Sequence, residues 1–272
     1  MVEPQLLDGR PDWLDVLIQR ATRADAQPPF SDGSLVALAT GSRRVLAIGD
    51  VAAALLGEGE AEFVVDPDAR RHGHGAALLE SLLERAPGLK VWAHGDHPAA
   101  RRLAETHGLA PVRELLQLRA SGFDTRPPSS AATHPAKDSD LDDWVALNAR
   151  AFAAHPEQGA VTRADLDVLM AEPWFDPADL LLLRDETGEL VGYCWLKVEH
   201  GIGEFYVVGV SPDRQGEGLG RRLVEAGLAR LAERGIRTAA LYVEADNEPA
   251  LRLYRSFGFA DHAVDIQYAP GA

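Results

Sequence analysis

Apolar and polar residues follow two different periods along this chain of 272 residues. Residues 11–25 and 218–234 carry apolar side chains three and four positions apart, as on one face of a helix, whereas 190–198 and 203–210 are short apolar runs typical of strands. For the first half, the pattern predicts helices over 11–25, 73–86 and 98–107, and strands over 34–40, 44–56, 60–65, 89–93 and 112–118.

The second half follows the same plan. Its pattern predicts helices over 140–153, 162–171, 218–234 and 247–257, and strands over 179–184, 190–198, 203–210, 238–244 and 262–268. Helices and strands are interspersed in both halves, so we expect the α/β class, with a mixed, twisted sheet flanked by helices in each half.

An internal repeat explains the similarity of the halves. Residues 67–86 read PDARRHGHGAALLESLLERA and residues 212–231 read PDRQGEGLGRRLVEAGLARL, with proline, aspartate, two glycines and a leucine in register. Further on, 98–110 matches 248–260, so the offset changes only from 145 to 150 residues. The sequence therefore predicts two related domains, each close to the usual size of a domain.

The boundary between the domains is predicted from composition. Residues 121–140 are rich in proline, serine and threonine and poor in large apolar side chains, which is typical of a linker. We therefore expect an N-terminal domain over 1–122, a linker over 123–137 and a C-terminal domain over 138–272.

Composition and charge exclude several classes of function. The 42 acidic residues outnumber the 27 basic ones, and the net charge of −15 opposes binding to nucleic acid or anionic membranes. No apolar run approaches the roughly 18 residues that a membrane span needs, and the N-terminus lacks the pattern of a signal peptide. We therefore expect a cytoplasmic protein that does not bind membranes. Cys194 lies in an apolar run and is predicted to be a buried hydrophobic residue rather than a nucleophile.

The glycines of the repeat suggest a binding site for an anion. A strand ends near Val210, the loop SPDRQGEGLG follows, and a helix begins near Leu219, so free backbone N–H groups meet the positive end of the helix dipole. The loop lacks the Lys-Ser/Thr pair of a Walker loop and the G-x-G-x-x-G spacing of a dinucleotide fold. The remaining pattern is Q-x-x-G-x-G in the second half and R-x-x-G-x-G in the first. This pattern indicates either an anion-binding site or only a turn. The residues concerned are Gln215, Gly218, Gly220, Arg70, Gly73 and Gly75.

The repeated loop in its strand-loop-helix setting resembles the GNAT superfamily of N-acetyltransferases, in which this loop holds the pyrophosphate of acetyl-CoA. Residues 154–162, 174–177, 192–198, 203–210 and 241–259 are further similar to the mycothiol synthase family, which joins two GNAT (acyl-CoA N-acyltransferase) domains. That resemblance implies transfer of acetyl from acetyl-CoA to the cysteinyl amine of a cysteine-glucosamine-inositol pseudo-disaccharide.

The same resemblance assigns the catalytic residues. A free α-amine has a pKa of roughly 7.7 to 8.0, so a base has to remove a proton before the amine attacks a thioester. The family's base matches Glu204, and the general acid that protonates the leaving thiolate matches Tyr254. Counting through the repeat gives Gly59 and Ala104 as their counterparts in the first half, so we expect catalysis only in the C-terminal domain, with acetyl-CoA binding in both.

The resemblance also implies two sets of cofactor-binding residues and one substrate set. The cofactor set of the second half is Val208, Gly209, Val210, Gln215, Gly216, Glu217, Gly218, Leu219, Gly220, Arg221, Asn247, Glu248, Pro249, Ala250, Leu251 and Arg252. The cofactor set of the first half is Phe63, Val64, Val65, Arg71, His72, Gly73, His74, Gly75 and Ala76. The substrate set is Asp32, Glu157, Lys197, Glu204 and Tyr242.

Other interpretations stay open. Clustered histidines can bind zinc, but here no cysteine or carboxylate completes a ligand set, so we expect no metal. The histidines of the cluster are His72, His74, His94, His97 and His107. The alternatives to the main function are acetylation of another small amine or of a protein N-terminus, or a non-catalytic acyl-CoA-binding module. We expect a monomer with small-molecule substrates.

Overall fold

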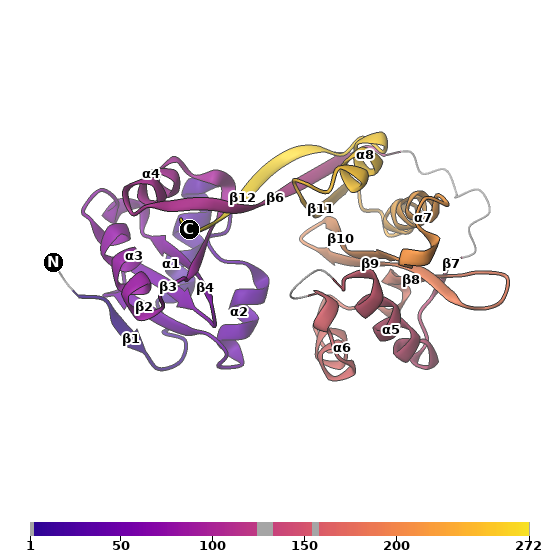
Figure 1. Cartoon of the computed structure of the whole chain (residues 1–272), viewed down its shortest axis with the longest axis horizontal. Helices are drawn as coiled ribbons and strands as arrows, with labels where there is room; N and C mark the ends of the chain where they lie inside the picture. Colours follow the sequence, from indigo (N-terminus) through magenta and orange to yellow (C-terminus); the bar gives the residue numbers. More distant parts are fainter. Residues whose placement is uncertain (1–2, 124–132, 154–157, 272) are drawn as a thin grey trace. The chain divides into compact units, whose positions relative to one another are not determined.

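The computed structural model describes residues 3–123, 133–153 and 158–271 (Figure 1). By its internal contacts the chain forms two units. Unit 1 comprises Met1–Leu116 together with Ala263–Ala272, and unit 2 comprises Gln117–His262. Each unit is a sheet with helices, which confirms the predicted fold class.

The sheet of unit 1 has the strand order β1-β2-β3-β4-β5-β12-β6. β4 and β5 are parallel, whereas β1 to β4 pair as antiparallel neighbours and β12 is antiparallel to β5. The bounds are β1 Gln5–Leu7, β2 Arg44–Ile48, β3 Ala52–Leu56, β4 Glu60–Val65, β5 Lys90–Ala93, β6 Leu109–Ser121 and β12 Ala260–Pro270.

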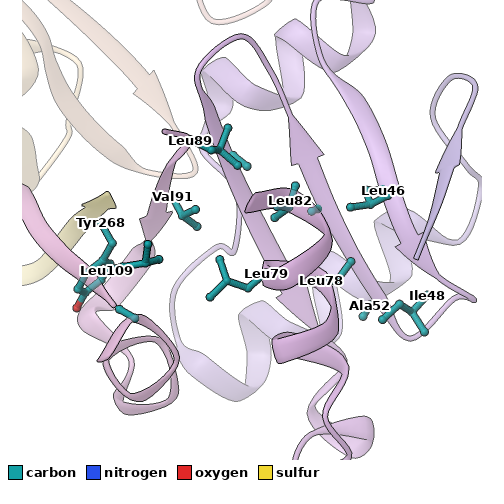
Figure 2. Close-up of a cluster of buried hydrophobic side chains, with 13 residues drawn as sticks. Leu46, Ile48, Ala52, Leu78, Leu79, Leu82, Leu89, Val91, Leu109 and Tyr268 are labelled. Atoms are coloured by element: carbon teal, nitrogen blue, oxygen red, sulfur yellow. The ribbon is translucent and has the colours of Figure 1, made fainter. Parts of the chain in front are cut away.

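Both faces of this sheet are covered by hydrophobic clusters. Val45 and Ala47 of β2 belong to a cluster with α1 (Leu14–Asp25) and α2 (Asp32–Ala39). Leu46 and Ile48 belong to a second cluster with α3 (His74–Arg85) and α4 (Pro98–Thr106), which Figure 2 shows. Alternate side chains of one strand point to opposite faces, so the sheet lies between two helical layers.

Unit 2 repeats this arrangement with the strand order β6-β11-β10-β9-β8-β7. Trp144 of α5 packs with Tyr193 and Trp195 on one face, and on the other face Gly227 of α7 lies against Phe205. The bounds are β7 Thr133–Pro135, β8 Leu180–Arg184, β9 Leu190–Glu199, β10 Ile202–Val210, β11 Thr238–Glu244, α5 Leu141–Ala151, α6 Arg163–Met170, α7 Leu219–Glu233 and α8 Glu248–Ser256.

The structure corrects two predictions in the first half. The expected strand over 34–40 is helix α2, because the Ser31 side chain accepts a hydrogen bond from the backbone N–H of Ser34 and caps the helix. The apolar run 44–56 is two strands separated by a turn at Gly49, whose φ of +54° favours glycine. β1 and β7 were not predicted.

The two longest strands pass from one unit to the other. β6 begins in unit 1 and ends in unit 2, and β12 begins in unit 2 and ends in unit 1. The final ten residues therefore belong with the N-terminal unit, whereas the composition had suggested a C-terminal domain continuous from 138 to 272. Most of the predicted linker, 124–132, lies outside the described residues.

Candidate active site and ligand-binding loops

The glycine loop of unit 2 leaves backbone amides open at the start of α7. β10 ends at Val210, a short 3-10 turn follows, and Gly218 occupies the N-cap position. Gly216 and Gly218 have φ values of +83° and +78°, a left-handed conformation that favours glycine. Among the described side chains none caps this helix. The first-turn N–H groups are therefore available to an anionic ligand.

Unit 1 contains the same loop beside a large cavity. Gly73, with φ +84°, is the N-cap of α3, and Arg71, with φ +68°, stands where the second copy has Gly216. The cavity has a volume of about 770 Å³ and extends from β4 and this loop to the start of α4. Of the predicted N-terminal cofactor set, all but His72 line it: Phe63, Val64, Val65, Arg71, Gly73, His74, Gly75 and Ala76.

The two loop motifs begin with different residues, Arg70 in unit 1 and Gln215 in unit 2, and different arginines fasten the two loops. Arg70 of unit 1 forms two hydrogen bonds with the Asp25 carboxylate, at 2.7 and 2.6 Å, and a third with the Val65 carbonyl at 3.2 Å. These bonds fasten the loop to α1 and β4. In unit 2, Arg214 fastens the loop by pairing with Glu217 and with Asp185 at 2.8 and 2.9 Å. Gln215 follows Arg214 as the C-cap of the 3-10 turn.

The remaining residues of the predicted cofactor set of unit 2 lie on β10, α7 and α8. Asn247 caps α8, because its side chain accepts a hydrogen bond from the Ala250 N–H at 3.2 Å. A Cβ at Gly209 would lie 2.4 Å from the Tyr193 ring, so packing against this tyrosine requires glycine there. Leu219, Gly220 and Arg221 form the first turn of α7, and Glu248, Pro249, Ala250, Leu251 and Arg252 form the start of α8.

Glu204 lies where β10 and β11 stop pairing. It is opposite Lys197 on β9 and Ala240 on β11, and Glu204–Ala240 is the last pair in the β10–β11 register. A β-bulge follows immediately, between Phe205 and Val207. The carboxylate is therefore carried by the strand that leads directly into the glycine loop.

Tyr254 is buried on α8. Its side chain is 9% exposed, and its ring contacts Phe259 with 5.8 Å between the ring centroids. Burial raises the pKa of Tyr254, so the hydroxyl stays protonated at neutral pH and can donate a proton. Cys194 is fully buried, as predicted, and burial raises the pKa of its thiol well out of the range of a nucleophile.

The predicted substrate residues are not all in one unit. Lys197 is nearly buried, and its ammonium group lies 2.9 Å from the Glu199 carboxylate. The Tyr242 hydroxyl accepts a hydrogen bond from the Gln117 side chain at 2.7 Å. Asp32 begins α2 in unit 1, whereas Lys197, Glu204 and Tyr242 are in unit 2, and Glu157 lies outside the described residues.

Comparison with known proteins identifies the family. The acetyltransferase (GNAT) family model matches residues 13–109 and 141–259. A mycothiol acetyltransferase from Clavibacter michiganensis is 53% identical to this chain over 96% of the chain and 93% of the relative, and one from Kytococcus sedentarius is 45% identical over 93% and 92%. This chain belongs to the GNAT family, among the mycothiol acetyltransferases.

Solved structures agree with the GNAT fold. A GCN5-related N-acetyltransferase from Sphaerobacter thermophilus superimposes with a TM-score of 0.71 at 22% identity, covering 97% of this chain and 95% of that one. A tandem GNAT protein from the clavulanic acid biosynthesis pathway gives a TM-score of 0.70 at 18% identity, covering 99% of both chains. At these identities the likeness shows the fold alone, and it confirms two GNAT domains in tandem.

Strand register identifies the residue of the N-terminal GNAT unit that corresponds to Glu204. Glu60 pairs with Lys90, and Glu204 pairs with Ala240. Lys90 and Ala240 are equivalent, since the offset of the repeat is 150 residues there. The expectation that Gly59 is the counterpart is therefore wrong, because the bulge adds one residue to β10 and changes the count.

Glu60 is held by three side chains of its own unit. It forms an ion pair with Arg43, and it accepts hydrogen bonds from the Trp92 indole at 3.1 Å and from the Gln267 amide at 3.3 Å. Ala104, the counterpart of Tyr254, is a buried core residue. The N-terminal GNAT unit therefore has a carboxylate at the position of Glu204, paired with Arg43, and an alanine at the position of Tyr254.

A buried group of charged side chains in the same unit was not predicted. His94 lies between two carboxylates, with Nδ1 3.0 Å from Asp265 and Nε2 3.6 Å from Glu62. Glu62 in turn accepts hydrogen bonds from the Ser31 N–H and hydroxyl, both at 2.8 Å, and from the Ser34 hydroxyl at 2.7 Å. No local pattern in the sequence indicates this arrangement, since its members come from β4, the segment after β5, and β12.

Within 3–123, 133–153 and 158–271, no group of three or more histidine, cysteine or carboxylate side chains is arranged to hold a metal ion. None of the helices in these ranges is long and apolar enough to cross a membrane.

The buried histidine predicts how stability depends on pH. Burial alone would lower the pKa of His94, but its hydrogen bond to Asp265 and the charge attraction of Glu62 and Asp265 raise it from 6.5 to about 10. Burial alone would raise the pKa of Glu62, but His94, Ser34 and Ser31 lower it from 4.5 to about 2. The stability that His94 contributes is therefore complete below about pH 6.5 and is lost as the pH rises through about 10. The stability that Glu62 contributes is complete above about pH 4.5 and is lost as the pH falls through about 2.

We therefore expect His94→Gln to reduce the free energy of unfolding most between about pH 4.5 and 6.5 and progressively less toward pH 10. Urea denaturation of both proteins across this range measures the difference. His72→Gln, at an exposed histidine of the glycine loop, is the control and should have little effect at any pH. A loss for His94→Gln that is constant from acid to alkaline pH would contradict the assignment.

Proposed function

We propose that this chain transfers the acetyl group of acetyl-CoA to the cysteinyl amine of the cysteine-glucosamine-inositol pseudo-disaccharide. The observation that carries the proposal is the identity of 53% to a mycothiol acetyltransferase over 96% of the chain. Both substrates are small molecules, and the net charge of −15 disfavours a nucleic acid partner.

The proposed mechanism uses one base and one acid of unit 2. Bound acetyl-CoA supplies the activated acetyl thioester. Glu204 accepts a proton from the cysteinyl ammonium, directly or through a water molecule, which leaves a neutral amine able to attack the thioester carbonyl. The attack gives a tetrahedral adduct. As its C–S bond breaks, Tyr254 donates its proton to the departing thiolate, and the proton that the nitrogen gives up restores the tyrosine hydroxyl.

Unit 1 is proposed to bind acetyl-CoA without turning it over. Support for binding comes from the cavity of about 770 Å³ beside the uncapped start of α3. Support for inactivity comes from the ion pair and hydrogen bonds that Glu60 makes with Arg43, Trp92 and Gln267, and from Ala104 at the position of Tyr254. Glu204 and Tyr254 are therefore proposed as the catalytic pair, in a reaction that uses no metal.

The acceptor is tested by measuring CoA release. We expect the pseudo-disaccharide to be acetylated with a kcat/KM well above that of other amines, namely glucosamine, spermidine and a peptide with a free N-terminus. Equal or greater activity with one of those amines would replace the proposed acceptor. No CoA release with any of them, while acetyl-CoA still binds in calorimetry, would favour a non-catalytic acyl-CoA-binding module.

Substitution of the base and the acid should give different pH profiles. Glu204→Gln keeps the size of the side chain but removes its basicity, and general-base catalysis is worth about 10²- to 10⁴-fold in rate. Because the acceptor amine loses its proton unaided above about pH 8, this variant should regain activity as the pH rises. Tyr254→Phe lacks the proton donor, so its defect should persist at high pH. Turnover measured from pH 6.5 to 9.5 with saturating acetyl-CoA distinguishes them, and wild-type rates in both variants would refute the mechanism.

The anion-binding role of the loop is tested at Gly218. Gly218→Val places a branched side chain beside the amides at the start of α7, so we expect the KM for acetyl-CoA to rise by about tenfold or more, the change that about 1.4 kcal/mol produces. Gly235→Val is the matched control, because Gly235 has a similar φ, +72° against +78°, and lies beyond the other end of the same helix. Equal KM values for the two variants would mean that the loop is only a turn.

A further inference from the structure

The β-bulge in β10 gives unit 2 one residue that unit 1 lacks. β10 pairs with β9 through Phe205–Leu196 and then Val207–Trp195, so Tyr206 is the additional residue. The equivalent pairing in unit 1, between β3 and β4, runs from Ala52–Val65 to Leu56–Ala61 without a shift. Bulges redirect side chains and are common beside active sites.

The bulge directs Tyr206 toward α5 and α6. Phe205 packs on the opposite face, against Gly227 of α7. The Tyr206 ring is instead 5.6 Å from the Trp195 ring, centroid to centroid, within the cluster that α5 and α6 cover. Trp195 and Lys197 are two residues apart on β9 and so share this face. Since Lys197 is directly opposite Glu204, Tyr206 is on the same face as the proposed base.

Trp174 completes an aromatic pair on this face. Its ring centroid is 5.2 Å from that of Tyr206, and the Lys197 ammonium lies 5.4 Å from it. Trp174 and Tyr206 are both partly exposed, whereas Trp144 and Trp195 behind them are fully buried. The two outer rings therefore present part of their surface to solvent beside a charged ammonium group that Glu199 and Trp174 hold in place.

This combination of groups suits one kind of ligand. A sugar ring has an apolar face of C–H groups and a rim of hydroxyls, so aromatic rings can cover the face while a fixed ammonium donates hydrogen bonds to the rim. We propose that Trp174 and Tyr206 form a subsite for a sugar ring of the acceptor, with Lys197 at its edge. The subsite rests on the proposed function, because it requires an acceptor that carries a sugar.

The experiment compares two acceptors that share the reacting amine. One is the full pseudo-disaccharide, and the other is cysteinamide, which has the same cysteinyl amine and no sugar. For Trp174→Leu and Tyr206→Leu we expect kcat/KM with the full acceptor to fall about tenfold, mainly through KM, the change that about 1.4 kcal/mol of lost binding produces. Activity with cysteinamide and the KM for acetyl-CoA should stay near wild type.

Conservative variants serve as controls for folding and for the tyrosine hydroxyl. Tyr206→Phe and Trp174→Phe retain a ring and should keep most of the preference for the full acceptor. Val168→Ala, at an exposed position of α6, should change nothing. The Leu variants are also checked by thermal unfolding. If one of them fails to fold, the Phe variants and the other Leu variant decide whether the rings bind a sugar.

Each outcome has a distinct meaning. An equal loss with both acceptors would show that the rings only support the fold, and an undiminished preference for the full acceptor in the Leu variants would show that no sugar binds there. Either result overturns the subsite and leaves the proposed function standing. A wild-type enzyme that acetylates cysteinamide as well as the pseudo-disaccharide would overturn the proposed acceptor and the subsite together.

Discussion

A short parallel pairing between two strands organises the proposed ligand site in each unit. β10 and β11 pair over residues 202–204 and 238–240, and β4 and β5 pair over 60–62 and 90–92. Beyond these pairs, each first strand continues toward a glycine loop and a helix start whose backbone amides are uncapped by the described side chains. Strand edge, loop and helix terminus together provide aligned donors for a long anionic ligand.

Duplication kept this framework and changed the side chains on it. Both copies have a carboxylate in the parallel pairing, with Glu60 in the first pair of β4 and Glu204 in the last pair of β10. Arg43, Trp92 and Gln267 hold Glu60 in a local network. The second copy also has a bulge and a buried tyrosine on α8. The chemical difference between the units thus comes from the neighbours of an acidic residue and not from its absence.

The sequence predicted those parts of the site that depend on local order. The glycine loops and their helices were evident because glycine, helix starts and apolar periods are local signals, whereas 34–40 has no clear period and was mistaken for a strand. The counterpart of Glu204 was misplaced because counting cannot detect a bulge, which appears only in the pairing of β10 with β9. His94 meets Asp265 across 171 positions, and no local pattern connects them.

The path of β12 has a consequence for how the chain is made. Asp265, Gln267 and Tyr268 contribute to the sheet, the polar contacts and the core of unit 1, yet they follow all of unit 2 in the sequence. Until they emerge, the edge of β5 that pairs with β12 is open, and open strand edges favour aggregation. First domains usually fold as units during synthesis, but the sheet of the N-terminal unit becomes complete only after the residues of unit 2 have been synthesised.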